Sequence, residues 1–168
     1  MFKQRSSQLQ SYCNIYDQIR DGLQKRTKEE IHGSLIVIAE MLHHTGDFML
    51  PRFREICKAI MALKEHSSRT VRLAIIQLIP ELAGFCPDTF ARSHLNEAVD
   101  MMIKSSKNSD LRALALQSIG RLSQAIGGHL VYRVQELMAV VKEVLLQKRK
   151  EVPREVLVCI SDMVIGTF

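Results

Sequence analysis

The sequence contains no tryptophan, and aromatic residues make up only 5% of its 168 residues. Glycine and proline are also scarce, with eight and four residues, and they lie mainly where periodic segments end. Leu, Ile, Ala, Met, Glu, Lys, Arg and Gln dominate those segments, and they mostly favour helix. A hydrophobic fraction of 46% and a charged fraction of 24% exclude a disordered chain and are typical of one globular domain with a continuous core.

Long apolar runs are missing as well. The richest run, SLIVIA at 34–39, is far shorter than the roughly 20 residues that a membrane span requires. The opening MFKQRSSQLQ lacks the apolar core of a signal peptide. The four cysteines show no CxxC pairing and no histidine at ligand spacing. We therefore expect a protein of a reducing compartment, without disulfides or membrane insertion, in the cytoplasm or at the periphery of an endomembrane within a larger complex.

Sequence motifs of catalysis are absent too. The chain has no GxxxxGK[ST], GxGxxG, HExxH or GxSxG pattern, and no cysteine has a base at a spacing that would activate it. His43 and His44 are adjacent, so on a helix they point about 100° apart and do not chelate one ion. We expect this pair to cap a helix end or face solvent. The sequence predicts no active site, no metal, no cofactor and no small-molecule substrate.

Positive charge is in modest excess, with a formal net charge of +5 and a sequence pI near 9.2. Small basic clusters lie at 25–28 (KRTK) and 148–150 (KRK), where we expect solvated turns; a phosphate-binding patch is the alternative. A nucleic-acid-binding helical repeat is accordingly the second functional hypothesis. The scarcity of aromatic residues counts against it, because few rings are left for bases to stack on.

What the sequence does have is an internal repeat of about 40 residues. TVRLAIIQLIPELAGF at 70–85 matches DLRALALQSIGRLSQA at 110–125, with Pro80 in one copy and Gly120 at the same place in the other. The same apolar pattern recurs about 40 residues earlier and 41 residues later. We expect a bend or a close helix contact at the level that Pro80 and Gly120 share. Gly127-Gly128 is expected to end its helix in a left-handed conformation.

Amphipathic segments of a second kind lie between these copies. Together the two kinds predict eight helices near 8–25, 29–45, 48–65, 69–85, 88–106, 110–126, 130–149 and 153–166. Two helices per 40-residue unit predict an all-α fold, an α-solenoid (superhelix) of about four HEAT-type antiparallel helix pairs. We expect a single solenoid over 1–168, with approximate repeats at 8–45, 48–85, 88–126 and 130–166.

The openings of two such helices, Val71-Arg72 and Leu111-Arg112, resemble the HEAT signature. The resemblance implies that Arg72 and Arg112 join an inter-repeat polar ladder, with Asp110 as the acidic member. The earlier repeat has Ser67, Ser68 and Thr70 where that aspartate would stand.

Longer strings resemble one particular family. IYDQIRDGLQKRTKEEIHGSLIVIAEML, HTGDFMLPRFREI and VRLAIIQLIPELAGFCPDTF are similar to the N-terminal HEAT region of target-of-rapamycin (TOR) kinases, and so are HLNEAVDMMI and LALQSIGRLSQAIG. The family is one of phosphatidylinositol-3-kinase-related protein kinases. The resemblance implies a non-catalytic scaffold that supports a dimeric complex and docks companion subunits such as Raptor, while a distant domain phosphorylates Ser/Thr. No residue here is assigned a chemical task by it, and the partner-binding surface is unknown.

The last residues, VLVCISDMVIGTF, are apolar and stop abruptly. A solenoid cut from a longer array exposes an apolar face at each end. We therefore expect a piece of a longer array that self-associates through its ends.

Overall fold

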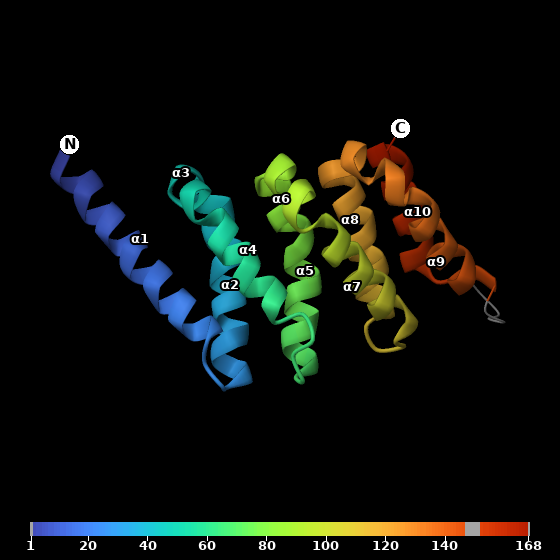
Figure 1. The fold of residues 1–168 in the computed structure, drawn as a ribbon, viewed down its shortest axis with the longest axis horizontal. Helices are drawn as coiled ribbons and strands as arrows, with labels where there is room; N and C mark the ends of the chain where they lie inside the picture. The colour runs from blue at the N-terminus through green and yellow to red at the C-terminus, as the bar shows by residue number, and fades with distance from the viewer. Residues whose placement is uncertain (1, 147–151, 168) are drawn as a thin grey trace. The chain divides into compact units, whose positions relative to one another are not determined.

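The computed structural model describes residues 2–146 and 152–167, and the side chains of 7–146 and 152–166. The basic cluster at 148–150 lies outside these residues. In chain order the helices are α1 (Phe2–Leu23), α2 (Lys28–His44), α3 (Gly46–Met49), the 3-10 helix η1 (Leu50–Arg52), α4 (Phe53–Ala62), α5 (Arg69–Phe85), α6 (Pro87–Ser93), α7 (Leu95–Lys107), α8 (Arg112–Leu130), the 3-10 helix η2 (Val131–Arg133), α9 (Val134–Leu146) and α10 (Arg154–Thr167) (Figure 1). The described residues contain no strand, and within each unit neighbouring helices pack against one another. The predicted all-α, helical-repeat solenoid class is confirmed.

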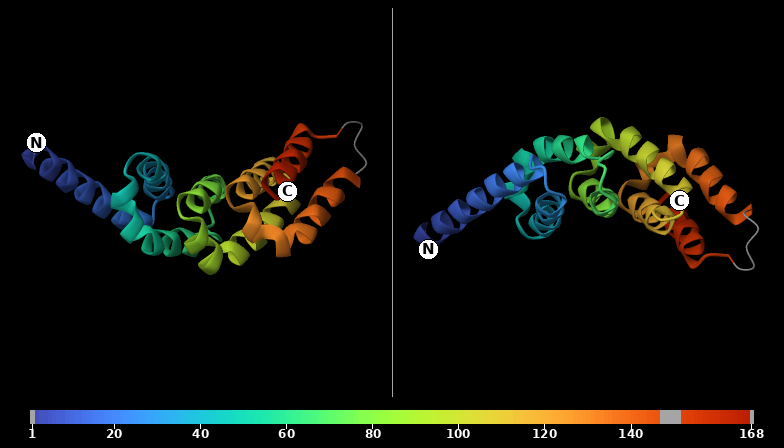
Figure 2. Two further views of the ribbon diagram at one scale, coloured as in Figure 1. Left: turned by 90° about the horizontal axis from the view of Figure 1, so that it is seen from above. Right: turned by 90° about the horizontal axis from the view of Figure 1, so that it is seen from below.

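The chain divides into two compact units, unit 1 (Met1–Ile75) and unit 2 (Ile76–Phe168). In unit 1, α1 and α2 run antiparallel and α1 also contacts α4. Figure 2 shows α2 nearly end-on, with α1 passing beside it. The core of unit 1 consists of apolar side chains that are almost fully buried: Ile19, Leu23, Ile31, Leu35, Ile38, Met49, Phe53, Ile56, Ile60 and Val71.

Unit 2 is built around α8, which contacts α7 on one side and α10 on another. The buried face of α8 carries small side chains as well as large ones, because the neighbouring helices approach it closely. The core of unit 2 consists of buried apolar side chains: Ile79, Leu82, Phe90, Val99, Met102, Leu116, Ile119, Leu122, Leu137, Val141, Val156 and Met163.

Two of the expected helices are interrupted. The expected helix at 48–65 is split into α3, η1 and α4, because Pro51 lies in η1 and has no N–H to donate to a preceding turn. The expected helix at 88–106 is split into α6 and α7 at His94, whose φ is −133°. No proline or glycine marks this second break.

The regular helix ends beside the glycine pair. α8 is interrupted at Ile126, with φ −142° and ψ 31°, and a second helical stretch continues to Leu130. No described glycine has a positive φ, so the expected left-handed stop at Gly127-Gly128 is wrong. The kink lies at Ile126, one residue before the glycine pair.

Pro80 and Gly120 occupy different settings at the level that the repeat assigns to them. Pro80 is buried inside a continuous α5. At Gly120 an added Cβ would lie 2.8 Å from Oδ2 and 2.9 Å from Cβ of Asp162 on α10. The predicted close contact at this level is therefore present at Gly120.

Candidate protein-interaction site

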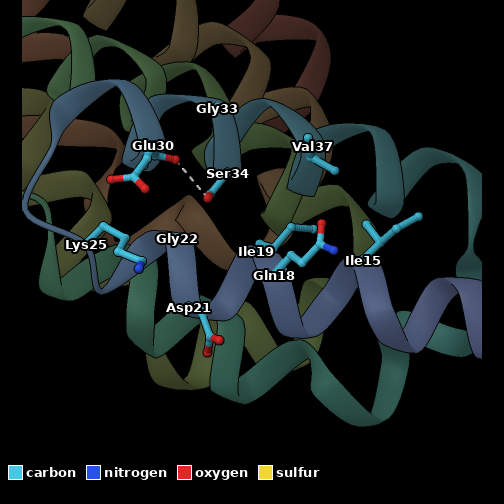
Figure 3. A pocket seen from close by; sticks show the side chains of 10 residues that line it. All are labelled: Ile15, Gln18, Ile19, Asp21, Gly22, Lys25, Glu30, Gly33, Ser34 and Val37. Atoms are coloured by element: carbon cyan, nitrogen blue, oxygen red, sulfur yellow. Dashed lines mark hydrogen bonds between the residues drawn. The ribbon is translucent and has the colours of Figure 1, made fainter.

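Unit 1 carries an open groove between α1 and α2 (Figure 3). A hollow of about 640 Å³ is bounded by Ile15 and Gln18 on α1 and by Gly33 and Val37 on α2. In Figure 3, Ile15, Gln18 and Ile19 rise from α1 toward α2, whereas Asp21 points to the opposite side. Two packed helices thus leave a trough whose walls are largely apolar.

A second hollow continues this groove along the same two helices. It has a volume of about 490 Å³ and lies between Leu9 and Tyr12 of α1 and the segment 44–48, where α2 passes into α3. The apolar side chains along the groove stay accessible: Leu9 is 53% exposed, Ile15 39% and Val37 38%. Apolar side chains grouped in a hollow are typical of a surface that another molecule covers.

The groove opens because α1 and α2 are pinned together at one end. A Cβ at Gly22 would overlap the hydroxyl oxygen of Ser34, so glycine is what allows the two helices to touch there. The Ser34 hydroxyl donates a 2.9 Å hydrogen bond to the carbonyl of Glu30 and is thereby satisfied within α2. From this contact the two helices diverge toward the N-terminal end of α1.

The opposite side of α1 is held by an aromatic and charged cluster. The hydroxyl of Tyr16 donates to Oε2 of Glu55 at 3.2 Å, and the Arg52 guanidinium lies 3.8 Å from the centre of the Phe48 ring and 5.4 Å from that of Tyr16. Burial, followed by the charge of Glu55, raises the pKa of Tyr16 to about 12. The phenol therefore stays protonated and keeps donating, which fixes α1 against α4.

A polar ladder joins the helices of unit 2. Arg121 on α8 forms an ion pair with Glu81 on α5, and Nε2 of Gln124 donates to Oδ1 of Asp162 on α10 at 2.7 Å. The sequence analysis missed this ladder. Its signal was present, because Glu81 and Arg121 have opposite charges and stand one 40-residue repeat apart.

The 3-10 helix η2, between α8 and α9, exposes the ring of Tyr132 beside Arg133, whose side chain is held by three hydrogen bonds. Arg133 donates to Asn96 at 3.1 Å, to Asp100 at 2.6 Å and to Glu136 at 2.8 Å. The hydrogen bond to Asp100 is the main reason that the pKa of Arg133 is raised. Next to it, Tyr132 is 93% exposed.

The arginines expected in the ladder donate to main-chain carbonyls six residues before them: Arg72 to the turn before α5, and Arg112 to the last turn of α7. Nη1 of Arg72 donates to the carbonyls of His66 and Ser67 at 2.6 and 2.8 Å, and Nε of Arg112 donates to the carbonyl of Ser106 at 2.9 Å. Arg72 and Arg112 therefore do the same work one repeat apart.

Asp110 belongs to the turn before α8. Its backbone N–H donates to Oδ1 of Asn108 at 2.9 Å, and its own Oδ1 accepts from the Ser109 hydroxyl at 3.2 Å. An inter-repeat ladder through Arg72, Arg112 and Asp110 stays a prediction.

His43, His44 and Cys159 are three described residues whose side chains could take part in catalysis. The rings of His43 and His44 are 6.4 Å apart, and Nε2 of His44 lies 3.4 Å from a carboxylate oxygen of Glu40. Burial, followed by the charge of Asp162, raises the pKa of Cys159 to about 12, which is opposite to the activation of a nucleophilic thiol.

Within the part of the chain that the structure describes, no group of three or more His, Cys, Asp or Glu is placed to hold a metal ion. No helix in that part is both long and apolar enough to cross a membrane.

Comparison with known proteins gives a consistent result. No protein-family model matches the chain. It is 27% identical to the serine/threonine-protein kinase TOR of Arabidopsis thaliana over 156 residues, which is 92% of this chain and 6% of that kinase. It is 26% identical to the serine/threonine-protein kinase tor1 of Schizosaccharomyces pombe over 144 residues, 86% of this chain and 6% of that kinase. With the serine/threonine-protein kinase TOR2 of Saccharomyces cerevisiae the identity is 23% over 164 residues, 92% of this chain and 7% of the kinase.

The chain therefore spans only 6–7% of the length of these curated relatives. The similarity extends along most of this chain and to the same kind of kinase in a plant and two yeasts. The resemblance to TOR kinases that the sequence carries is confirmed.

Proposed function

We propose that this chain, similar to a short segment of TOR kinases, is a non-catalytic scaffold that corresponds to their N-terminal HEAT region. The observation that supports the proposal most is that the match covers nearly all of this chain and only a small part of each kinase. It covers 86–92% of this chain and 6% of the TOR and tor1 kinases. A segment of that size made of paired helices is a module for contacts between proteins. The phosphotransfer activity of the relatives then belongs to a domain elsewhere in them.

The partners we propose are companion subunits of a TOR-type complex, such as Raptor, bound in the cytoplasm. The accessible groove of unit 1 and the polar ladder of unit 2 supply two different surfaces for them. Exposed apolar side chains on α10, such as Leu157, Val164 and Ile165, additionally favour self-association of the chain.

A pull-down with a purified Raptor-type subunit tests the scaffold role. The 168-residue chain is immobilised and compared with two variants, Val37→Asp in the groove and Arg121→Glu in the ladder. We expect the wild-type chain to retain the subunit and at least one variant to lose it. Absence of retention by the wild-type chain would contradict the proposal. A phosphotransfer assay with labelled ATP and a generic protein substrate tests the non-catalytic part, and turnover by the purified chain would refute it.

Nucleic-acid binding is the second candidate, because exposed Lys25 and Arg26 lie in the turn between α1 and α2, and exposed Lys28 begins α2. Such binding depends steeply on salt, since each neutralised phosphate releases counterions. A salt titration with labelled single-stranded and double-stranded oligonucleotides separates the candidates. Tight binding with a steep salt slope would favour this function over the scaffold.

A further inference from the structure

The groove of unit 1 is long enough to hold a helix of several turns. Its two hollows follow α1 from Gln8 to its last residue, Leu23, a distance of about 23 Å at 1.5 Å per residue. Leu9, Ile15 and Val37 supply accessible apolar contacts along this length. An occupant with apolar side chains spaced over four or five helical turns would cover all of them.

The walls of the groove decide the secondary structure of the occupant. Both walls are mainly helix, so their main-chain N–H and C=O groups are already paired along α1 and α2. The groove therefore offers side-chain contacts and no free sheet edge. A segment that enters it must satisfy its own backbone, and an α-helix does this while presenting an apolar stripe.

The charged side chains along the groove indicate which charges a bound helix would carry on either side of its apolar stripe. Glu30 lines the first hollow and Asp47 the second, and Glu40 follows Val37 by one turn of α2. Lys25 lines the first hollow, and His44 lines the second, where its Nε2 lies 3.4 Å from a carboxylate oxygen of Glu40. This acidic strip lies on a chain whose net charge is +5. Carboxylates at this position repel nucleic acid and anionic lipid, and they attract Lys and Arg.

We propose that the groove between α1 and α2 binds a basic amphipathic helix of a partner protein. The helix lays an apolar stripe on Leu9, Ile15 and Val37, and its Lys and Arg side chains reach Glu30 and Asp47. This proposal rests on the scaffold function and goes further, because it states which surface is used and what kind of segment it takes.

The test uses a synthetic peptide of about 18 residues, long enough to cover the groove. Leu stands at i, i+3, i+4 and i+7 spacing, with Lys and Arg on both flanks and a fluorescent label. Binding to the full 168-residue chain is measured by anisotropy. A matched peptide has Glu in place of every Lys and Arg, and a third has the basic peptide's composition in scrambled order. We expect saturable binding of the basic peptide and binding at least about tenfold weaker for the other two.

Variants of the chain locate the binding site. Val37→Asp puts a charge on the apolar wall, and we expect it to weaken binding of the basic peptide about tenfold or more. Glu30→Lys should weaken the basic peptide and strengthen the Glu peptide. Leu146→Asp on α9 makes a matched change at an exposed apolar side chain of unit 2 and should leave the affinity unchanged. Circular dichroism of each variant checks folding, and because Val37 and Glu30 are both exposed, their replacement leaves the core intact.

Three results would overturn the proposal: equal affinity for the basic and Glu peptides, an affinity unaffected by both Val37→Asp and Glu30→Lys, or a dimer of the chain that Val37→Asp dissociates. The last would show that a second copy occupies the groove. If the peptide fails to bind while the chain still retains the Raptor-type subunit, this inference alone is wrong. If the peptide binds and the subunit is not retained, the proposed function is wrong instead.

Discussion

Replacing Gly120 with alanine tests the close packing of α8 against α10 in unit 2. The added Cβ would lie 2.8 Å from Oδ2 and 2.9 Å from Cβ of Asp162. Rotation of the carboxylate relieves the first contact and not the second, because the Cβ of Asp162 is carried by the backbone of α10. The helix has to move, and the 2.7 Å hydrogen bond from Gln124 to Asp162 is lost with it.

The magnitude follows from three contributions. Overpacking of a close contact costs about 1–3 kcal/mol. Loss of the hydrogen bond adds about 0.5–1 kcal/mol. Alanine in a helix interior is about 1 kcal/mol more favourable than glycine, which offsets part of the loss. The expected net decrease in the free energy of unfolding is about 0.5–3 kcal/mol.

Gly128→Ala is the matched control, because it makes the same change in the same helix and the added Cβ meets nothing within 4 Å. We expect this control to be neutral or to stabilise by up to about 1 kcal/mol. Urea unfolding followed by circular dichroism measures both variants. If Gly120→Ala proves as stable as Gly128→Ala, the close approach of α8 and α10 is not what fixes glycine at this position.

Three further predictions concern ionisable side chains. Arg133→Gln should lower the free energy of unfolding by about 1 kcal/mol in urea titrations, and a double-mutant cycle with Asp100→Asn should show coupling that salt weakens. Burial, followed by the charge of Glu55, raises the pKa of Tyr16 to about 12 from an ordinary value of 10.0, so its contribution to stability is present below pH 10 and lost toward pH 12. Tyr16→Phe should flatten the alkaline unfolding profile over that window, and an unchanged profile would contradict the raised pKa. Burial lowers the pKa of His94 below 6.5, so the neutral imidazole stabilises the fold above that pH, and this contribution is lost on acidification. His94→Gln should therefore lose less stability than the wild type between pH 7 and about pH 5, measured by thermal melts.

The repeat was the part of the fold most accessible from the sequence. TVRLAIIQLIPELAGF and its copy set the period, and α5 runs over Arg69–Phe85 as the periodicity predicts. The interruption at Pro51 was also visible in the sequence as a missing donor. The break at His94 was not, because neither residue type nor spacing distinguishes it from the helical residues on either side.

The surfaces were much harder to predict. Ile36 and Val37 lie in the most apolar run of the chain, yet both are exposed. Val37 is exposed in the groove that α1 leaves where it diverges from α2 beyond the contact at Gly22. That divergence depends on how a glycine in one helix meets a serine in the next. The ion pair between Glu81 and Arg121 was predictable in principle from charge and repeat spacing. The arginines at the helix openings drew the sequence analysis to a different ladder, which stays a prediction; Arg72 and Arg112 also donate to main-chain carbonyls six residues before them.

The contacts made by α8 also bear on how a chain of this kind can change in length. Arg121 faces α5, while Gly120 and Gln124 face α10, so one helix serves two neighbours at fixed angular positions. A single residue inserted between Arg121 and Gln124 would turn Gln124 and every following side chain by about 100°, so the contacts with α5 and with α10 would no longer form at the same time. An insertion in the turn at 24–27 would disturb neither. Insertions and deletions in related chains should therefore accumulate in the turns, and the spacing between Gly120 and Gln124 should stay constant.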